Sequence, residues 1–126
     1  MSNLREVNFE RLQGRTLEAR LRERRRFVQV VAGPRQVGKT TVVTQVMARL
    51  SCPSLYASAD EPSLRDAAWL RAQWDRARLL SREGGRDGAV LILDEVQKLP
   101  SWSDTVKALW DEDTRARRPL KVVVLG

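Results

Sequence analysis

Two hydrophobic periods alternate along the chain. Short runs of apolar and β-branched residues predict strands at 27–32, 54–59, 89–93 and 120–125. Apolar positions spaced by three or four predict the helices between them: one at 8–26, one at 38–50, one that follows Pro62 and ends before residue 82, and one from Ser103 to Trp110. Strands that alternate with helices predict an α/β fold, in which a parallel sheet is covered on both faces.

Cap and turn residues give the expected boundaries of these elements. Asp60 is a suitable N-cap with Pro62 in the first turn of the next helix, and Ser103 is suited to cap the last helix. Polar stretches rich in glycine or arginine, at 82–88 and 111–119, are expected to be loops. Trp74 falls on the apolar spacing of the third helix, which favours a place in the core over a ligand-binding role.

A glycine-rich segment lies between the first predicted strand and the second predicted helix. Residues 33–40 match the pattern Gly-x-x-x-x-Gly-Lys-[Ser/Thr] without a gap. Glycines let the backbone approach a phosphate closely, and the free N–H groups at a helix start favour anions. Lys39 is expected to reach the β and γ phosphates, and the Thr40 hydroxyl to ligate Mg²⁺. The candidate phosphate-binding residues are Gly33, Pro34, Arg35, Gln36, Val37, Gly38, Lys39, Thr40 and Thr41. An ordinary glycine turn with a solvent-facing lysine is the alternative.

A pair of acids directly follows the most apolar strand. Asp94 and Glu95 come after residues 89–93, an uninterrupted apolar run typical of a strand buried on both faces. Ligands of parallel sheets bind at the carboxyl ends of the strands, where the glycine-rich loop is also expected. Asp94 is therefore predicted to hold Mg²⁺, directly or through water, and Glu95 to orient or deprotonate an attacking water. A carboxylate pair exposed in a loop is the alternative interpretation.

Composition restricts the classes of protein to consider. The length of 126 residues suits one domain, and 42% hydrophobic with 31% charged residues is typical of a soluble globular protein. No apolar run approaches the ~20 residues that span a bilayer, and the first residues lack the apolar stretch of a secretory signal. A single cysteine excludes an internal disulfide, and the absence of histidine excludes imidazole chemistry. We therefore expect a cytoplasmic protein that does not associate with membranes.

The net charge of +7 comes from one part of the chain. Residues 1–50 contain eleven Arg and Lys against four Asp and Glu, whereas the two signs balance in the remainder. A basic face attracts nucleic acids and other polyanions, and a solvated helix rich in arginine is the simpler interpretation. No aromatic residue lies within 20–26, so the sequence does not indicate a platform for stacking bases.

Two longer strings narrow the classification. Residues 33–41 read GPRQVGKTT, and residues 93–100 read LDEVQKLP with Trp102 just beyond. These strings resemble the AAA-type ATP-binding domain of a large prokaryotic ATPase family, in which a C-terminal domain of unknown function typically follows. The resemblance extends over about residues 9–126. It implies a P-loop NTPase fold with a parallel sheet of about four strands, in the order 1-4-3-2, and helices on both faces.

The resemblance also implies residue roles. Lys39 and Thr40 match the Walker A residues that bind phosphate and magnesium. Asp94 matches the metal-holding aspartate of the Walker B motif, and Glu95 matches the glutamate that activates water. Gln97 belongs to the family string without a firm role, as does Lys98.

The same family pattern continues past the last residue of this chain. Family sheets usually have the order 5-1-4-3-2, and the fifth strand, the lid, the sensor residue and any arginine finger would follow Gly126. We therefore expect residues 1–26 to form a basic helical segment and 27–126 an incomplete ATPase core. The first strand would then be an open edge of the sheet.

These observations predict Mg²⁺-dependent ATP binding, with ATP hydrolysis in the complete protein. No Asn-Lys-x-Asp motif for guanine is present, which favours ATP over GTP. A homo-oligomer or a protein partner is expected in the full-length form. The alternative function is a non-hydrolysing switch or interaction module controlled by nucleotide, which contacts DNA through the basic first segment. A small-molecule kinase is disfavoured because no substrate lid is recognisable.

Overall fold

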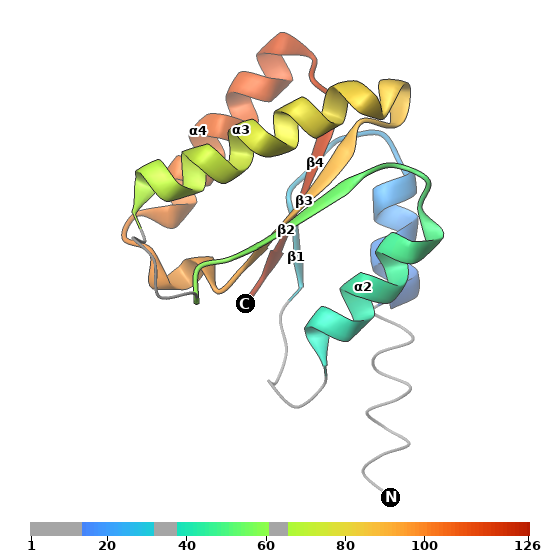
Figure 1. Ribbon diagram of the computed structural model, residues 1–126, viewed down its shortest axis with the longest axis horizontal. Coiled ribbons are helices and arrows are strands. Elements are labelled where there is room, and N and C mark those ends of the chain that lie inside the picture. Colours follow the sequence, from blue (N-terminus) through green and yellow to red (C-terminus); the bar gives the residue numbers. More distant parts are fainter. Residues whose placement is uncertain (1–13, 32–37, 61–65) are drawn as a thin grey trace, which may run out of the picture.

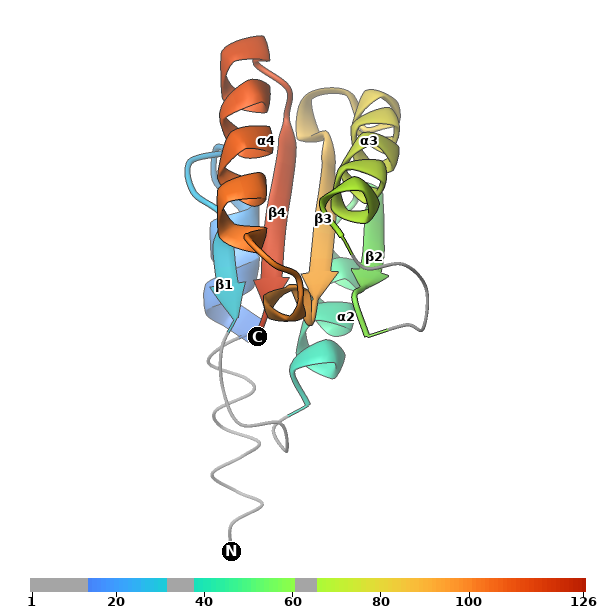
Figure 2. The same ribbon diagram turned by 90° about the vertical axis from the view of Figure 1, so that its left-hand side faces the viewer.

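Four parallel strands form the centre of the molecule. A computed structural model of the chain describes residues 14–31, 38–60 and 66–126. The strands have the spatial order β1-β4-β3-β2, as predicted, and Figure 2 shows all four pointing the same way. Their bounds are Gln29–Val31 for β1, Ser54–Ser58 for β2, Ala89–Asp94 for β3 and Leu120–Leu125 for β4. In the described part of the chain β1 pairs with β4 alone, so it forms one edge of the sheet.

Helices cover both faces of this sheet (Figures 1 and 2). One face carries α3 (Ala67–Glu83) and α4 (Trp102–Ala116). The opposite face carries α2 (Lys39–Arg49) and a helix over residues 14–22. Two short 3-10 turns, η2 (Gly85–Asp87) and η3 (Val96–Lys98), flank β3.

The alternation of side chains along β3 divides the core into two layers. Leu91 and Leu93 pack with α3 and α4, whereas Val90 and Ile92 pack with α2 and the helix over residues 14–22. All four side chains are buried, which explains the uninterrupted apolar run of this strand. Trp74 is also fully buried, so its assignment to the core is confirmed.

The first described helix is shorter than predicted. It ends at residue 22 rather than 26, and the next strand begins at Gln29 rather than Phe27. The Lys121 ammonium donates to the carbonyl oxygens of Leu21 and Glu23, which stabilises the end of the helix at this point. The start of the predicted helix, residues 8–13, lies outside the described residues, and so does Ala32 at the end of the predicted strand.

Two predicted N-caps were wrong. The α3 helix is capped by Asp66, whose carboxylate accepts a hydrogen bond from the Trp69 N–H at 2.9 Å, and Asp60 lies in a turn after β2. The α4 helix begins at Trp102 with Ser101 as the N-cap residue, two residues before Ser103. A capping residue precedes its helix by one position, so the later start of α3 and the earlier start of α4 also move their caps.

The predicted loop at 111–119 was also wrong, because α4 continues to Ala116. Polar residues suggested a loop, but Asp113 is fully buried and accepts hydrogen bonds from three side chains. These donors are Trp74 Nε1 at 2.7 Å, Arg78 Nε at 2.8 Å and Arg118 Nη1 at 3.0 Å. Partners from α3 thus stabilise two further turns of α4 that its own composition does not predict.

Candidate functional site

The carboxyl ends of the four strands meet at one edge of the sheet. Backbone hydrogen bonds continue past the ends of the strands and join each neighbouring pair. They run from Ala59 N to Asp94 O (2.9 Å), from Glu95 N to Leu125 O (3.3 Å) and from Gly126 N to Val31 O (3.1 Å). The residues that follow the strands are therefore held beside one another, where parallel sheets bind their ligands.

The amino terminus of α2 opens toward this edge (Figure 2). Gly38 precedes α2 with φ 64° and ψ 47°, a left-handed conformation that glycine adopts without a steric penalty. No described side chain caps the helix, and its first turn contains no acidic residue. The N–H groups of this turn are thus available for an anionic ligand, which the helix dipole also favours.

Asp94 lies at the end of β3 on the face of the sheet that α2 covers. The side chains of a strand alternate, so Asp94 shares the face of Val90 and Ile92. Glu95 follows in a left-handed conformation, with φ 61° and ψ 23°, and turns the chain away from the strand. The two acids therefore occupy different surroundings although they are adjacent in the sequence.

Tyr56 links Asp94 to the start of α2. Its hydroxyl donates a hydrogen bond to Asp94 Oδ2 across the β2–β3 pair. Burial and then the hydrogen bond with Asp94 and its negative charge raise the pKa of Tyr56 to about 12, against the ordinary 10.0. Hydrogen bonding with Thr40 and Ser58 acts in the opposite direction and lowers this pKa. The phenol oxygen thus lies among the predicted Walker A threonine, the predicted Walker B aspartate and a serine.

Glu95 is surrounded by polar side chains of the following turn. Gln97 donates its amide N–H to Glu95 Oε2 at 3.1 Å, and the Lys98 ammonium lies 3.8 Å from the same oxygen. Lys98 also forms an ion pair with Asp60, which follows β2. Gln97 and Lys98, which had no firm role in the sequence analysis, therefore contact the predicted catalytic glutamate.

The structure brings together only part of the predicted site. It places Thr40, Asp94 and Glu95 at one edge, with Thr41 exposed in the first turn of α2. Lys39 is the first residue of α2. The remaining loop positions lie outside the described residues: Gly33, Pro34, Arg35, Gln36 and Val37.

Tyr56 is the residue that the sequence analysis missed. It lies in an alternating strand, Ser54–Ser58, whose apolar members Leu55 and Ala57 face α3 and α4. Tyr56 is a polar aromatic residue on the opposite face of the sheet, and Asp94, the candidate metal ligand, lies on that same face. This shared face was the signal in the sequence that could have identified Tyr56. The register that pairs Ser58 with Asp94 is not visible in the sequence, so the contact itself could not be predicted.

The oxygen groups at this edge fit a magnesium ion. Thr40 offers a hydroxyl and Asp94 a carboxylate, and Mg²⁺ typically takes one or two such protein ligands together with phosphate and water. Among the described residues, no group of three or more Asp, Glu, Cys or His side chains converges as a self-sufficient metal site. The donor set therefore suits a metal that arrives with a phosphate ligand.

Comparisons with known proteins agree with this arrangement. The family model described as "AAA domain" matches residues 25–126, which is more than half of the chain. A search of curated proteins found no match. Within the described residues, none of the helices has the length and apolar character that a membrane crossing requires. From its parallel sheet, the acids at the sheet edge and this match, the chain belongs to the AAA domain family of nucleotide-binding P-loop proteins.

Proposed function

We propose that this chain binds ATP together with Mg²⁺ and that the complete protein hydrolyses ATP. The observation that carries this proposal is that the Tyr56 hydroxyl donates a hydrogen bond to Asp94 while Thr40 lowers the pKa of the same hydroxyl, although Thr40 and Asp94 belong to motifs far apart in the sequence. A helix start without a side-chain cap lies beside them. Oxygen ligands next to free backbone N–H groups suit a metal-bound triphosphate.

Each residue has a distinct role in this proposal. Residues 33–38 and the first turn of α2 bind the phosphates through backbone N–H groups, and Lys39 contributes a positive charge to the β and γ phosphates. Thr40 and Asp94 hold the Mg²⁺, which neutralises charge on the phosphate oxygens when it is bound. Glu95 orients the attacking water and accepts its proton. Gln97 and Lys98 orient the Glu95 carboxylate through a hydrogen bond and an ion pair.

The test measures affinity and turnover on the same sample. The purified chain is titrated with fluorescent ATP and GTP, with Mg²⁺ or with EDTA, and phosphate release is followed in parallel. We expect ATP to bind more tightly than GTP, and Mg²⁺ to strengthen the binding of ATP. Lys39→Ala should weaken ATP binding by at least about tenfold, since a charged contact is worth about 1.5–3 kcal/mol.

Lys107→Ala is the matched control, because Lys107 is an exposed lysine of α4 that forms no ion pair with the other described residues. Its affinity for ATP should equal that of the parent chain. Equal affinities of Lys39→Ala and Lys107→Ala would reject the proposal, and so would a folded parent chain that binds neither nucleotide. Binding without phosphate release would support the binding role and contradict hydrolysis by this chain alone.

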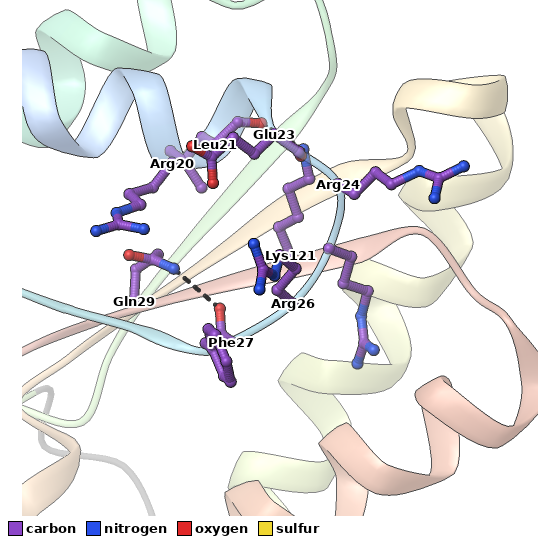
Figure 3. Close-up of a pocket in the computed structure, with 9 residues that line it drawn as sticks. Arg20, Leu21, Glu23, Arg24, Arg26, Phe27, Gln29 and Lys121 are labelled. Carbon is purple, nitrogen blue, oxygen red and sulfur yellow. Dashed lines mark hydrogen bonds between the residues drawn. The ribbon is translucent and has the colours of Figure 1, made fainter.

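One observation favours a second function, contact with single-stranded nucleic acid. Phe27 directly follows the arginine-rich segment, and 68% of its surface is exposed. The Arg26 guanidinium lies 5.7 Å from the centre of its ring, and the exposed Arg20 lines the same pocket as Phe27 (Figure 3). An exposed ring among cations is the arrangement on which a base can stack. Residues 20–26 contain no aromatic residue, but the adjacent Phe27 is exposed and can serve as the stacking surface.

This second function has its own test. Binding of fluorescent single-stranded DNA by the chain should fall steeply between 50 and 200 mM salt, because phosphate contacts release counterions. Phe27→Ala should weaken binding at low salt by at least about fivefold, since base stacking is worth about 1–3 kcal/mol. Leu79→Ala, at an exposed leucine of α3, is the control for a lost apolar surface. No binding at low salt, or equal losses in both variants, would exclude a stacking role for Phe27.

A further inference from the structure

The hydroxyl of Tyr56 contacts one of the two side chains that the proposed function assigns to the metal. It donates a hydrogen bond to Oδ2 of Asp94, across the pairing of β2 with β3. The described residues offer no other side-chain hydrogen bond to Asp94. The tyrosine is therefore the contact that fixes the rotation of this carboxylate.

We propose that Tyr56 is a positioning residue, which holds Asp94 through Oδ2 and leaves Oδ1 for the Mg²⁺ that binds with the nucleotide. This inference rests on the proposed function and names a further residue of the same site. A carboxylate ligand in proteins is usually oriented by an outer hydrogen bond, and losing that partner typically weakens metal affinity by about 10–100-fold. The tyrosine acts through Asp94 and does not itself touch the nucleotide.

Packing does not explain why a tyrosine occupies this position. Tyr56 lies in β2, which in the described part of the chain pairs with β3 alone, and 47% of its surface is exposed. The ring therefore contributes less apolar burial than the fully buried Ile92, its register partner on β3. The hydroxyl, in contrast, makes a charge-assisted hydrogen bond, which is about twice as strong as a neutral one.

The experiment compares Tyr56→Phe with the parent chain and uses binding, not turnover. Affinity for fluorescent ATP is measured in EDTA and at increasing Mg²⁺, and the ratio of the two affinities gives the gain due to magnesium. We expect Tyr56→Phe to reduce this gain by about tenfold and to leave the affinity in EDTA unchanged. Ser54→Ala, on the same face of β2 but away from Asp94, should leave both values unchanged.

A double-mutant cycle tests whether Tyr56 acts through Asp94. In an Asp94→Ala background, Tyr56→Phe should have no additional effect on the gain due to magnesium, because the side-chain acceptor of the tyrosine hydroxyl is already absent. Additive losses would overturn the inference. A larger magnesium gain in Tyr56→Phe would also overturn it, because the hydroxyl would then compete with the metal.

Two further outcomes separate this inference from the proposed function. If the parent chain binds ATP with a magnesium gain that Tyr56→Phe retains, the inference fails and the proposed function stands. If the folded parent chain shows no magnesium gain, the proposed function fails and the inference fails with it. Melting temperatures of all variants identify a general structural role, which would lower affinity equally in EDTA and in Mg²⁺.

Discussion

The two ends of the sheet hold their charged groups in different ways. At the amino end, Arg25 donates to backbone oxygens of Leu120 and Trp110 at 2.7 and 2.9 Å, and to the Thr114 hydroxyl at 2.7 Å. Its guanidinium also lies 3.4 Å from the centre of the Trp110 ring. At the carboxyl end, Asp94, Glu95 and Lys98 interact with other side chains of the same edge.

This difference separates structural charges from functional ones. Groups at the amino end bond to backbone carbonyls and to a buried carboxylate, which cannot leave without opening the fold. Lys121 belongs to this class, because it donates to two carbonyls at the end of the first described helix and lines a cavity of only about 20 Å³ (Figure 3). Side chains at the carboxyl end are partly exposed, so they can replace their contacts with one another by contacts with a ligand. The predictions below test this contrast.

The largest effect is expected from Asp113→Ala at the amino end. This change leaves Arg78 and Arg118 without their shared carboxylate and Trp74 without an acceptor. Breaking such a buried charge pair typically costs about 3–5 kcal/mol of unfolding free energy, measurable by urea denaturation. Asp104→Asn, on the exposed start of α4, is the control and should change stability by less than about 0.5 kcal/mol. A loss below about 1 kcal/mol for Asp113→Ala would contradict its structural role.

A smaller loss is expected from Arg25→Ala. The variant removes three hydrogen bonds and the stacking on Trp110, which should lower the unfolding free energy by about 2–3 kcal/mol. Arg25→Lys should recover only part of this loss, because an ammonium lacks the planar fork. Arg24→Ala, in the neighbouring exposed position, is the control and should be nearly neutral. Equal effects at 24 and 25 would remove the distinction between bonded and solvated arginines.

At the carboxyl end, alkaline titration should report the bond between Tyr56 and Asp94. The pKa of Tyr56 is raised to about 12, so the folded state favours the protonated phenol. This contribution to stability is fully present below the ordinary pKa of 10.0 and is lost as the pH rises through about 12. Tyr56 is the single tyrosine of the chain, so tyrosinate absorbance reports this group alone.

Asp94→Asn should move that titration midpoint toward 10.0, because it removes the charge that opposes ionisation. The parent chain unfolded in urea supplies the reference midpoint. An unchanged midpoint in Asp94→Asn would show that burial alone raises the pKa of Tyr56 and that the hydrogen bond with Asp94 does not contribute.

The smallest effect concerns two residues in left-handed conformations, one at each end of the sheet. Glu95 has φ 61° and Arg117 has φ 56°. A glycine adopts this conformation without the steric cost of about 1 kcal/mol, so Glu95→Gly should be more stable than Glu95→Ala by up to about that amount. Arg117→Gly against Arg117→Ala gives the matched comparison. Chemical denaturation measures both pairs, and a glycine less stable than alanine at position 95 would show that the turn is not strained.

The sequence predicted the sheet better than the ends of its helices. Strand β4 has the predicted bounds 120–125, and β3 extends beyond its predicted bounds by Asp94 alone. Both strands could be predicted because each contains a run of apolar, mostly β-branched or leucine residues, which is visible in the local sequence. The last turns of α4 depend on Asp113, whose partners come from α3 and are distant in sequence. No local pattern identifies such a carboxylate as buried.

The sequence could predict those residues of the candidate site that lie within a recognisable motif. Asp94 and Glu95 were identified because they follow an apolar strand, and Thr40 because it follows a glycine-lysine pair. Their approach to Tyr56 depends on the pairing of β2 with β3, which is a property of the folded sheet. Residues 33–37 lie outside the described part of the chain, so their role stays a prediction.

The division of the core into two layers also divides the chain's chromophores. The four tryptophans, Trp69, Trp74, Trp102 and Trp110, all pack in the layer of α3 and α4. The single tyrosine lies on the face of α2. Tryptophan fluorescence and tyrosine absorbance therefore monitor opposite sides of one sheet without any added label. Unfolding followed by both signals will reveal whether the two layers melt together or in sequence.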